Sequence, residues 1–193
     1  MRIFVAIDLA IPVVENLVLL QEDLTKPLED LGAIPKWVPA ENIHLTLKFI
    51  GEADEGLTYL VRDRVREIAT SSSLFELQTL GTGCFPAPSA PRILWAGVGE
   101  GADRLSSLRD QIETAFAEIG IANDEREYRP HVTIGRIKTD KSRIDISEIL
   151  SSYANTPYGT THIRGLVVYE SRLDRSGAIY RVVERCPFGN PNQ

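Results

Sequence analysis

Two short stretches of the chain repeat the pattern histidine, apolar residue, threonine, apolar residue, and each lies in a run typical of a buried strand. They are His44-Leu45-Thr46-Leu47 and His131-Val132-Thr133-Ile134. Because side chains alternate between the faces of a strand, each histidine shares a face with the threonine two residues later. Two of the three histidines in the chain occur in this pattern. The repetition predicts a duplicated unit, with one histidine strand in each half.

Hydrophobic periodicity around both stretches predicts the same order of elements in each half: strand, helix, histidine strand, helix, strand. The expected helices are 11–31, 57–69, 104–119 and 144–153, and the expected strands are 2–9, 42–50, 74–80, 92–98, 129–137, 160–170 and 178–184, the last two joined by a turn at 174–177. Glycine and proline mark the segment 81–91 as a loop, which we expect to cross between the halves. Strands with hairpin-like neighbours favour an α+β fold with antiparallel sheets.

Length and composition are those of an ordinary globular protein. The 193 residues are 43% hydrophobic and 25% charged, which is enough for one generous core or two small lobes, and we expect residues 1–193 to form a single domain. The apolar run at the start is interrupted by Asp8 and is too short for a secretion signal or a membrane span. We therefore expect a cytoplasmic protein, and the acidic balance favours a soluble monomer.

The charge and the cysteines exclude several classes of protein. A net charge of −6 argues against a protein that coats nucleic acid through a basic face, although a pocket for one phosphate needs only a few local donors. Cys84 and Cys186 lie far apart, which indicates neither a disulfide framework nor a zinc site. Two histidines would also need further ligands to hold zinc. We expect no metal and no cofactor.

The two repeated motifs suit acid–base chemistry on a phosphodiester. Imidazole titrates near neutral pH, so one histidine can hold a proton while another lacks one. Opening a phosphodiester needs a base for the attacking oxygen, an acid for the departing oxygen and donors for the nonbridging oxygens. His44 and His131 can meet the first two needs, and Thr46 and Thr133 can hydrogen-bond the phosphate.

With these motifs the chain resembles the 2H phosphoesterase superfamily, and within it the RNA 2′,3′-cyclic phosphodiesterase family, also called 2′-5′ RNA ligase or LigT/ThpR-like proteins. The resemblance covers nearly the whole chain. The matching segments are Arg2 to Ile7, Trp37 to Gly51, Gly81 to Val98, Arg129 to Arg136 and Tyr169 to Ser171.

The resemblance implies a bilobal fold of two pseudo-symmetric halves, with antiparallel sheets at a central cleft and helices outside. It implies hydrolysis of an RNA 2′,3′-cyclic phosphate to a 2′-phosphate, with 2′-5′ joining of tRNA halves as the reverse reaction. By similarity, His44 is the proton donor to the leaving 3′ oxygen and His131 is the base that activates water. Thr46 and Thr133 are expected to hold the phosphate, and Arg136 to neutralise it.

Other side chains carry weaker functional interpretations. Arg136 lies at an odd offset from His131, so it reaches the histidine face only if a bulge near Gly135 turns it. His162 lacks a following threonine and is interpreted as a surface residue of a strand. Arg126, Arg129 and Lys48 are weaker phosphate candidates than Arg136, and the aromatic candidates for stacking a base are Trp37, Phe49, Phe85, Trp95 and Tyr128.

Two alternatives stay open on the sequence alone. The same pocket could hold a nucleoside phosphate without converting it, as a binding module of the 2H type. It could also act on a small cyclic nucleotide rather than on the end of an RNA. The physiological RNA, its base preference and the direction of the reaction cannot be read from the residues.

Overall fold

A computed structural model describes residues 1–140, 144–174 and 177–189, which fold into helices and strands in the expected order. The predicted duplication of strand, helix, histidine strand, helix, strand is present in both halves. The elements are β1 (Arg2–Asp8), α1 (Ile11–Asp30), β2 (Ala33–Trp37), the 3₁₀ helix η1 (Ala40–Asn42), β3 (His44–Glu52), α2 (Glu55–Ser71), β4 (Phe75–Phe85), β5 (Ile93–Val98), α3 (Ala102–Glu118), β6 (Val132–Thr139), α4 (Ser147–Ser151), β7 (Pro157–Ile163), β8 (Gly165–Asp174) and β9 (Gly177–Pro187).

The nine strands of the described residues form one antiparallel sheet rather than two separate ones. Its order is β7-β4-β5-β6-β3-β1-β8-β9, and β2 pairs with β6 beside this path. The order is symmetric about the joint between β6 and β3, the two histidine strands. Each of them has a partner on its outer side, β5 for β6 and β1 for β3. The expected α+β class is confirmed, and each half of the sheet contains one of the two histidine strands.

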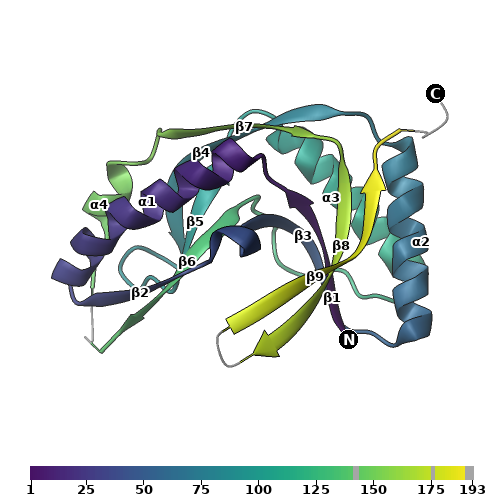
Figure 1. Cartoon of the computed structure of the whole chain (residues 1–193), viewed down its shortest axis with the longest axis horizontal. Coiled ribbons are helices and arrows are strands. Elements are labelled where there is room, and N and C mark those ends of the chain that lie inside the picture. The colour runs from purple at the N-terminus through teal and green to yellow at the C-terminus, as the bar shows by residue number, and fades with distance from the viewer. Residues whose placement is uncertain (141–143, 175–176, 190–193) are drawn as a thin grey trace.

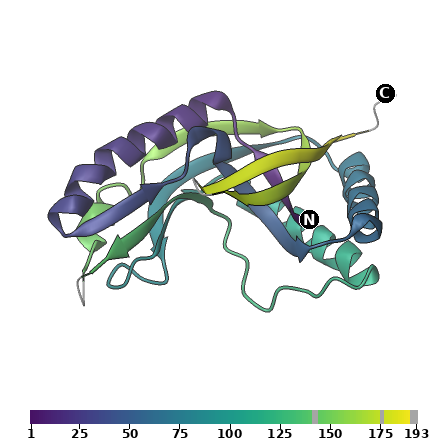
Figure 2. The ribbon, with the colours of Figure 1, turned by 60° about the horizontal axis from the view of Figure 1, so that its bottom comes forward.

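Helices cover each half of this sheet by burying one apolar stripe. Helix α1 has Pro12 in its first turn and buries residues three or four apart, as an amphipathic helix does. It packs on β2 and β7, whereas α2 packs on β8 and β9 and α3 packs on β3 and α2. Helices α1 and α4 therefore lie at one end of the molecule, and α2 and α3 lie at the other (Figure 1, Figure 2).

Several boundaries differ from those expected, among them the start of β6 at Val132 rather than at 129, and two of the differences concern where the chain crosses between the halves. The segment 81–91 is no crossing, because β4 extends to Phe85 and pairs with β5 as its neighbour in the same half. The expected strand 160–170 is two strands, divided at Arg164: β7 pairs with β4, and β8 pairs with β1. The chain thus crosses between the halves at Arg164, as it also does between β3 and β4. Residues 175 and 176 of the expected turn lie outside the described residues.

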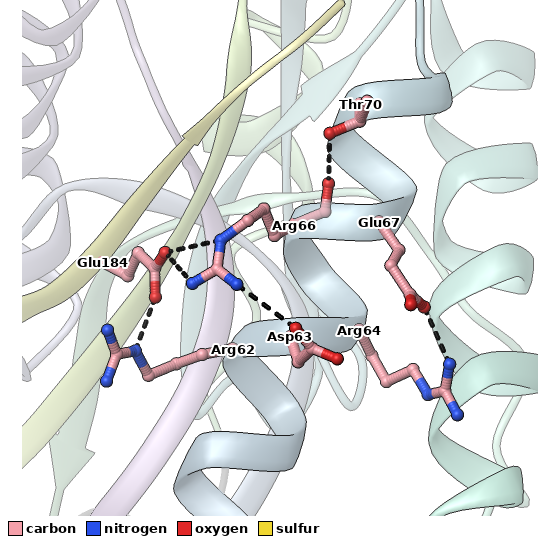
Figure 3. A network of polar contacts seen from close by, with 7 residues as sticks. All are labelled: Arg62, Asp63, Arg64, Arg66, Glu67, Thr70 and Glu184. Carbon is pink, nitrogen blue, oxygen red and sulfur yellow. Dashed lines mark hydrogen bonds and ion pairs between the residues drawn. The ribbon is translucent and has the colours of Figure 1, made fainter. Parts of the chain in front are cut away.

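Strand β9 forms one edge of the sheet and is tied to helix α2 by ion pairs (Figure 3). Glu184 of β9 accepts from Arg62 Nε at 2.5 Å and from Arg66 Nη2 at 2.6 Å. Burial raises the pKa of this carboxyl, but the two guanidinium groups outweigh it and hold the pKa below the usual value. The β8–β9 hairpin is therefore fixed at its base by side chains as well as by its backbone ladder.

Candidate active site

The two histidine motifs meet where the halves of the sheet join. Among the described residues, β3 and β6 are paired through Leu45 and Val132, both fully buried. Extending this antiparallel register by one residue in each direction sets His44 beside Thr133 and Thr46 beside His131. Leu45 and Val132 face the core, so the four polar side chains belong to the opposite face of the joint.

Both imidazoles are oriented by the same backbone contact. His44 Nδ1 lies 2.8 Å from the carbonyl oxygen of Asn42, and His131 Nδ1 lies 2.6 Å from that of Arg129. A carbonyl oxygen only accepts, so each Nδ1 carries the proton that is donated. The neutral imidazoles therefore have an unprotonated Nε2, which can accept a proton or, once charged, donate one. In both histidines Nδ1 anchors the ring, and Nε2 is the atom available for proton transfer.

Aromatic rings from three strands enclose His44. Its ring centroid lies 5.0 Å from that of Phe4 and 5.2 Å from that of Tyr180, which meets it edge-on, and 6.2 Å from Tyr169. This burial lowers the pKa of His44 below its usual value, and the Asn42 carbonyl and the Asp8 carboxylate oppose the shift. In the free protein the neutral form of His44 is thus favoured by its surroundings.

His131 has a different environment on the other half of the sheet. Phe85 of β4 meets the imidazole edge-on at 5.0 Å, and the Trp95 ring of β5 lies 6.4 Å away. The expected aromatic candidates Phe85 and Trp95 are thus brought to a catalytic-motif histidine. Each imidazole packs against aromatic rings from its own half of the sheet. The Nε2 edge of the ring is polar, and this edge distinguishes each histidine from an ordinary core side chain.

The two threonines lie as the alternation predicts. Thr46 Oγ1 is 3.0 Å from Nε2 of His44, and because Nδ1 carries the ring proton, the hydroxyl donates to Nε2. Thr133 is half-buried and pairs across the sheet with Trp95. Both hydroxyls therefore belong to the face that carries the imidazoles, where a bound anion could replace the contact that Thr46 makes with His44.

Arg136 reaches this face because β6 contains the expected bulge. Trp95 pairs with Thr133, but Leu94 pairs with Gly135, so Ile134 is an extra residue on β6. Because the bulge reverses the alternation, the Arg136 side chain lies on the same face of the sheet as Thr133. Burial raises the pKa of the Tyr180 hydroxyl, and the charge of Arg136 opposes this shift. The guanidinium of Arg136 therefore lies close enough to Tyr180 to interact with it electrostatically. The Tyr180 ring in turn packs against His44.

A second bulge removes Lys48 from the same face. Ala6 of β1 pairs with Thr46, but Val5 pairs with Lys48, so Leu47 is an extra residue on β3. Lys48 consequently points to the core and is only 2% exposed. The bulge thus turns Lys48 away from the histidine face, a feature that the sequence pattern does not contain.

The remaining candidates lie away from the two imidazoles or have other partners. His162 is an exposed residue of β7 with Glu76 as its partner at 3.1 Å, which fits the expected surface role. The Trp37 indole donates to Thr25 Oγ1. Tyr128 lies under the guanidinium of Arg109, and the Arg129 side chain pairs with Glu127. Phe49 is 64% exposed and borders Phe4.

Three residues of the His44 environment were not singled out from the sequence. Tyr180 lies on β9, and no local motif marks it. Asn42 donates from Nδ2 to the Ala178 carbonyl of β9 while its own carbonyl orients His44. Asp8 lies opposite His44 in the β1–β3 register and binds Arg185 and the Tyr169 hydroxyl. Such partners depend on strand pairing, which single-sequence patterns do not specify.

Among the described residues, no three or more histidine, cysteine, aspartate or glutamate side chains are grouped so that they could hold a metal ion. Within the same ranges, no helix combines the length and the apolar character that a membrane span requires.

Comparison with known proteins gives one consistent family. Residues 20–175 match the family model described as the 2′-5′ RNA ligase superfamily. A curated relative from Aquifex aeolicus, named RNA 2′,3′-cyclic phosphodiesterase, is 35% identical over 83% of this chain and 85% of its own.

Two solved structures show the same fold over nearly their full length. The protein TT0787 of Thermus thermophilus has a TM-score of 0.79 and 26% identity, covering 99% of this chain and 100% of its own. E. coli LigT complexed with 3′-AMP has a TM-score of 0.77 and 22% identity, covering 98% of each chain. The expected resemblance and its fold are confirmed, and the chain belongs to the 2′-5′ RNA ligase superfamily.

Proposed function

We propose that this protein hydrolyses the 2′,3′-cyclic phosphate at an RNA end to a 2′-phosphate, using His44 and His131 as acid and base. The observation that carries the proposal is the pairing of Leu45 with Val132, which brings both motifs to one face. Diagonal neighbours in an antiparallel pair are about 7–8 Å apart along the backbone, a span that one phosphate group can bridge. The name of the Aquifex aeolicus relative supports the same substrate class.

The proposed reaction moves one proton at each histidine. His131 Nε2 takes a proton from water, and the water oxygen forms a bond to phosphorus. The bond from phosphorus to the 3′ oxygen breaks, and protonated His44 donates from Nε2 to that oxygen. The products are a 3′-hydroxyl and a 2′-phosphate. The 2′-5′ joining reaction would follow the same path, with a ribose hydroxyl in place of water as the attacking group and the 3′ oxygen again as the leaving group.

Thr46, Thr133 and Arg136 are proposed to hold the nonbridging oxygens. Hydroxyl and guanidinium donors that already face the phosphate lower the cost of the charge that builds up in the transition state. Their shared face supports this assignment. The scheme uses no metal. Both motifs come from one chain, so we propose that a monomer is active.

We further propose that residues 1–193 are a single domain whose two lobes are the two halves of the sheet. The symmetric strand order supports this division. An RNA substrate also favours the cytoplasm as the place of action.

The test is the product formed from a short RNA that carries a 2′,3′-cyclic phosphate. We expect a 2′-phosphate, resolved from a 3′-phosphate by phosphorus NMR, at a rate that chelation with EDTA leaves unchanged. Binding without conversion would instead show a nucleotide-binding module. Conversion of a small cyclic nucleotide at least tenfold faster than the RNA end would assign the site to small substrates. A 3′-phosphate product or loss of activity with EDTA would contradict the proposed mechanism.

The pH dependence should reflect the lowered pKa of His44. The acid must be protonated, and its protonated fraction falls as the pH rises through its pKa, so the alkaline limb belongs to His44. Burial lowers this pKa in the free enzyme, so we expect the free enzyme to lose its protonated acid at lower pH than the substrate complex does.

The profile of kcat reports the bound state and should differ. An anionic phosphodiester beside His44 favours the charged imidazole, so the alkaline limb of kcat is expected at higher pH than that of kcat/KM. The measurement is a pair of pH profiles from the same initial-rate data. Identical alkaline limbs in the two profiles would argue against His44 as the acid.

A further inference from the structure

A buried ion network connects the two histidine motifs from the core side of the joint. Lys48 follows Thr46 by two residues on β3, and its side chain is 1% exposed. Its Nζ lies 2.9 Å from Glu113 of α3, 2.9 Å from the Ala122 carbonyl and 3.2 Å from Asp124. An ammonium group has three donors, and three acceptors are present. Two of the three belong to the segment that leads to His131.

That segment, residues 121–131, has no helix or strand of its own. Its position therefore depends on side-chain contacts with the rest of the protein. Glu113 also accepts from the Asp124 backbone amide, at 3.2 Å. Arg109 binds Glu113 at 3.0 Å and lies 5.3 Å from the centre of the Tyr128 ring. The ion network thus holds both Asp124 and Tyr128 within this segment.

The far end of the segment is in contact with both histidine motifs. The Tyr128 hydroxyl donates to the Thr46 carbonyl at 3.3 Å. The next residue, Arg129, supplies the carbonyl that accepts from His131 Nδ1. A displacement of the segment would therefore move the oxygen that fixes the protonated nitrogen of His131, whereas the corresponding oxygen for His44 lies in η1.

We infer that Lys48 is a positioning residue for His131, acting through Glu113 and the segment 121–131. Its buried charge holds the Arg129 carbonyl against Nδ1, and this contact keeps Nε2 unprotonated for its work as a base. The inference rests on the role proposed for His131. Burying a lysine is costly unless every donor is satisfied, and here all of its partners lie on α3 or on this segment.

The decisive experiment compares Lys48→Met with the double variant Lys48→Met/Glu113→Met. The single variant leaves Glu113 buried without its lysine and is expected to lose stability. The double variant removes the buried lysine and glutamate together, and Arg109, the other partner of Glu113, keeps Asp124 at 3.6 Å, so we expect part of the stability to return. It does not restore the contacts that Lys48 makes with Ala122 and Asp124, so the segment lacks these two anchors.

The readout is the tautomer of each histidine, measured by imidazole ¹⁵N NMR without any substrate. In the wild type we expect a proton on Nδ1 of both His44 and His131. In both variants we expect His131 to show a mixture of tautomers, while His44 stays unchanged and serves as an internal reference. Because no substrate is present, failure of this test is distinct from failure of the proposed function.

Kinetics provide the second readout. We expect kcat on the cyclic RNA end to fall about 10- to 100-fold in both variants with KM within about threefold, because misplacing a reacting group by an ångström has effects of this size. Ile112→Ala is the control, since Ile112 is a fully buried residue of the same helix and belongs to the core. It should lower stability and leave the His131 tautomer unchanged.

Two outcomes would overturn the inference. If the double variant recovers both stability and kcat, Lys48 contributes to stability alone. If the His131 tautomer shifts as much in Ile112→Ala as in Lys48→Met, any loss of stability moves this histidine and Lys48 has no particular role.

Discussion

His44→Ala and His131→Ala are each expected to lower kcat/KM for a cyclic RNA end by about 10²- to 10⁴-fold, the usual contribution of a general acid or base. The two imidazoles lie on one face of the β3–β6 joint and each is oriented through Nδ1 by a backbone carbonyl. Alanine removes the proton donor or acceptor and leaves the strand register in place. Initial rates with a purified cyclic-phosphate RNA measure the effect.

His162→Ala is the matched control. His162 lies on β7 with 66% of its side chain exposed, and Glu76 is its partner. Its removal should change kcat/KM by less than twofold. Circular dichroism of all three variants should show the wild-type spectrum. If either motif histidine can be removed with less than a tenfold loss, the acid–base assignment is wrong.

Leu45→Ala is expected to lower the free energy of unfolding by about 2–5 kcal/mol, the range for a leucine truncated in a packed core. Leu45 is fully buried, and it is the residue of β3 that pairs with Val132 to join the halves. Truncation leaves a cavity directly behind the two motifs. Urea unfolding followed by tryptophan fluorescence measures the change.

Leu19→Ala provides the comparison for this second substitution. Leu19 lies on helix α1 and is 56% exposed, so its truncation removes little buried surface. We expect a change within about 0.5 kcal/mol, as for most surface substitutions. Equal losses in the two variants would mean that the joint does not depend on the packing of Leu45.

Much of the site could be predicted from the sequence because it depends on local alternation. A strand sets residues two apart on one face, so the position of His44 beside Thr46 follows from spacing. The duplication follows from the repeated order of elements. The meeting of the two histidine motifs at one joint does not follow from the local pattern, because the pairing of β3 with β6 is a long-range contact.

The differences between the expected and the observed elements also arise from long-range strand pairing. Bulges on β3 and β6 reverse the alternation after each motif, which buries Lys48 and turns Arg136 to the histidine face. A bulge is specified by the pairing partner as well as by the strand, so the sequence indicated only that Gly135 could permit one. The division of 160–170 at Arg164 was missed because β7 and β8 are continuous in hydrophobic pattern but pair in different halves.

The joint of the sheet has a consequence for motion. Its paired residues, Leu45 and Val132, lie next to both imidazoles. If one half turned about this point, each atom would travel in proportion to its distance from the pivot. The outermost strands, β7 and β9, would swing widely, while the spacing of the two reacting nitrogens would hardly vary. A rotation of one half about this joint would therefore reshape the outer parts of the face that carries the imidazoles and leave the two imidazoles near each other.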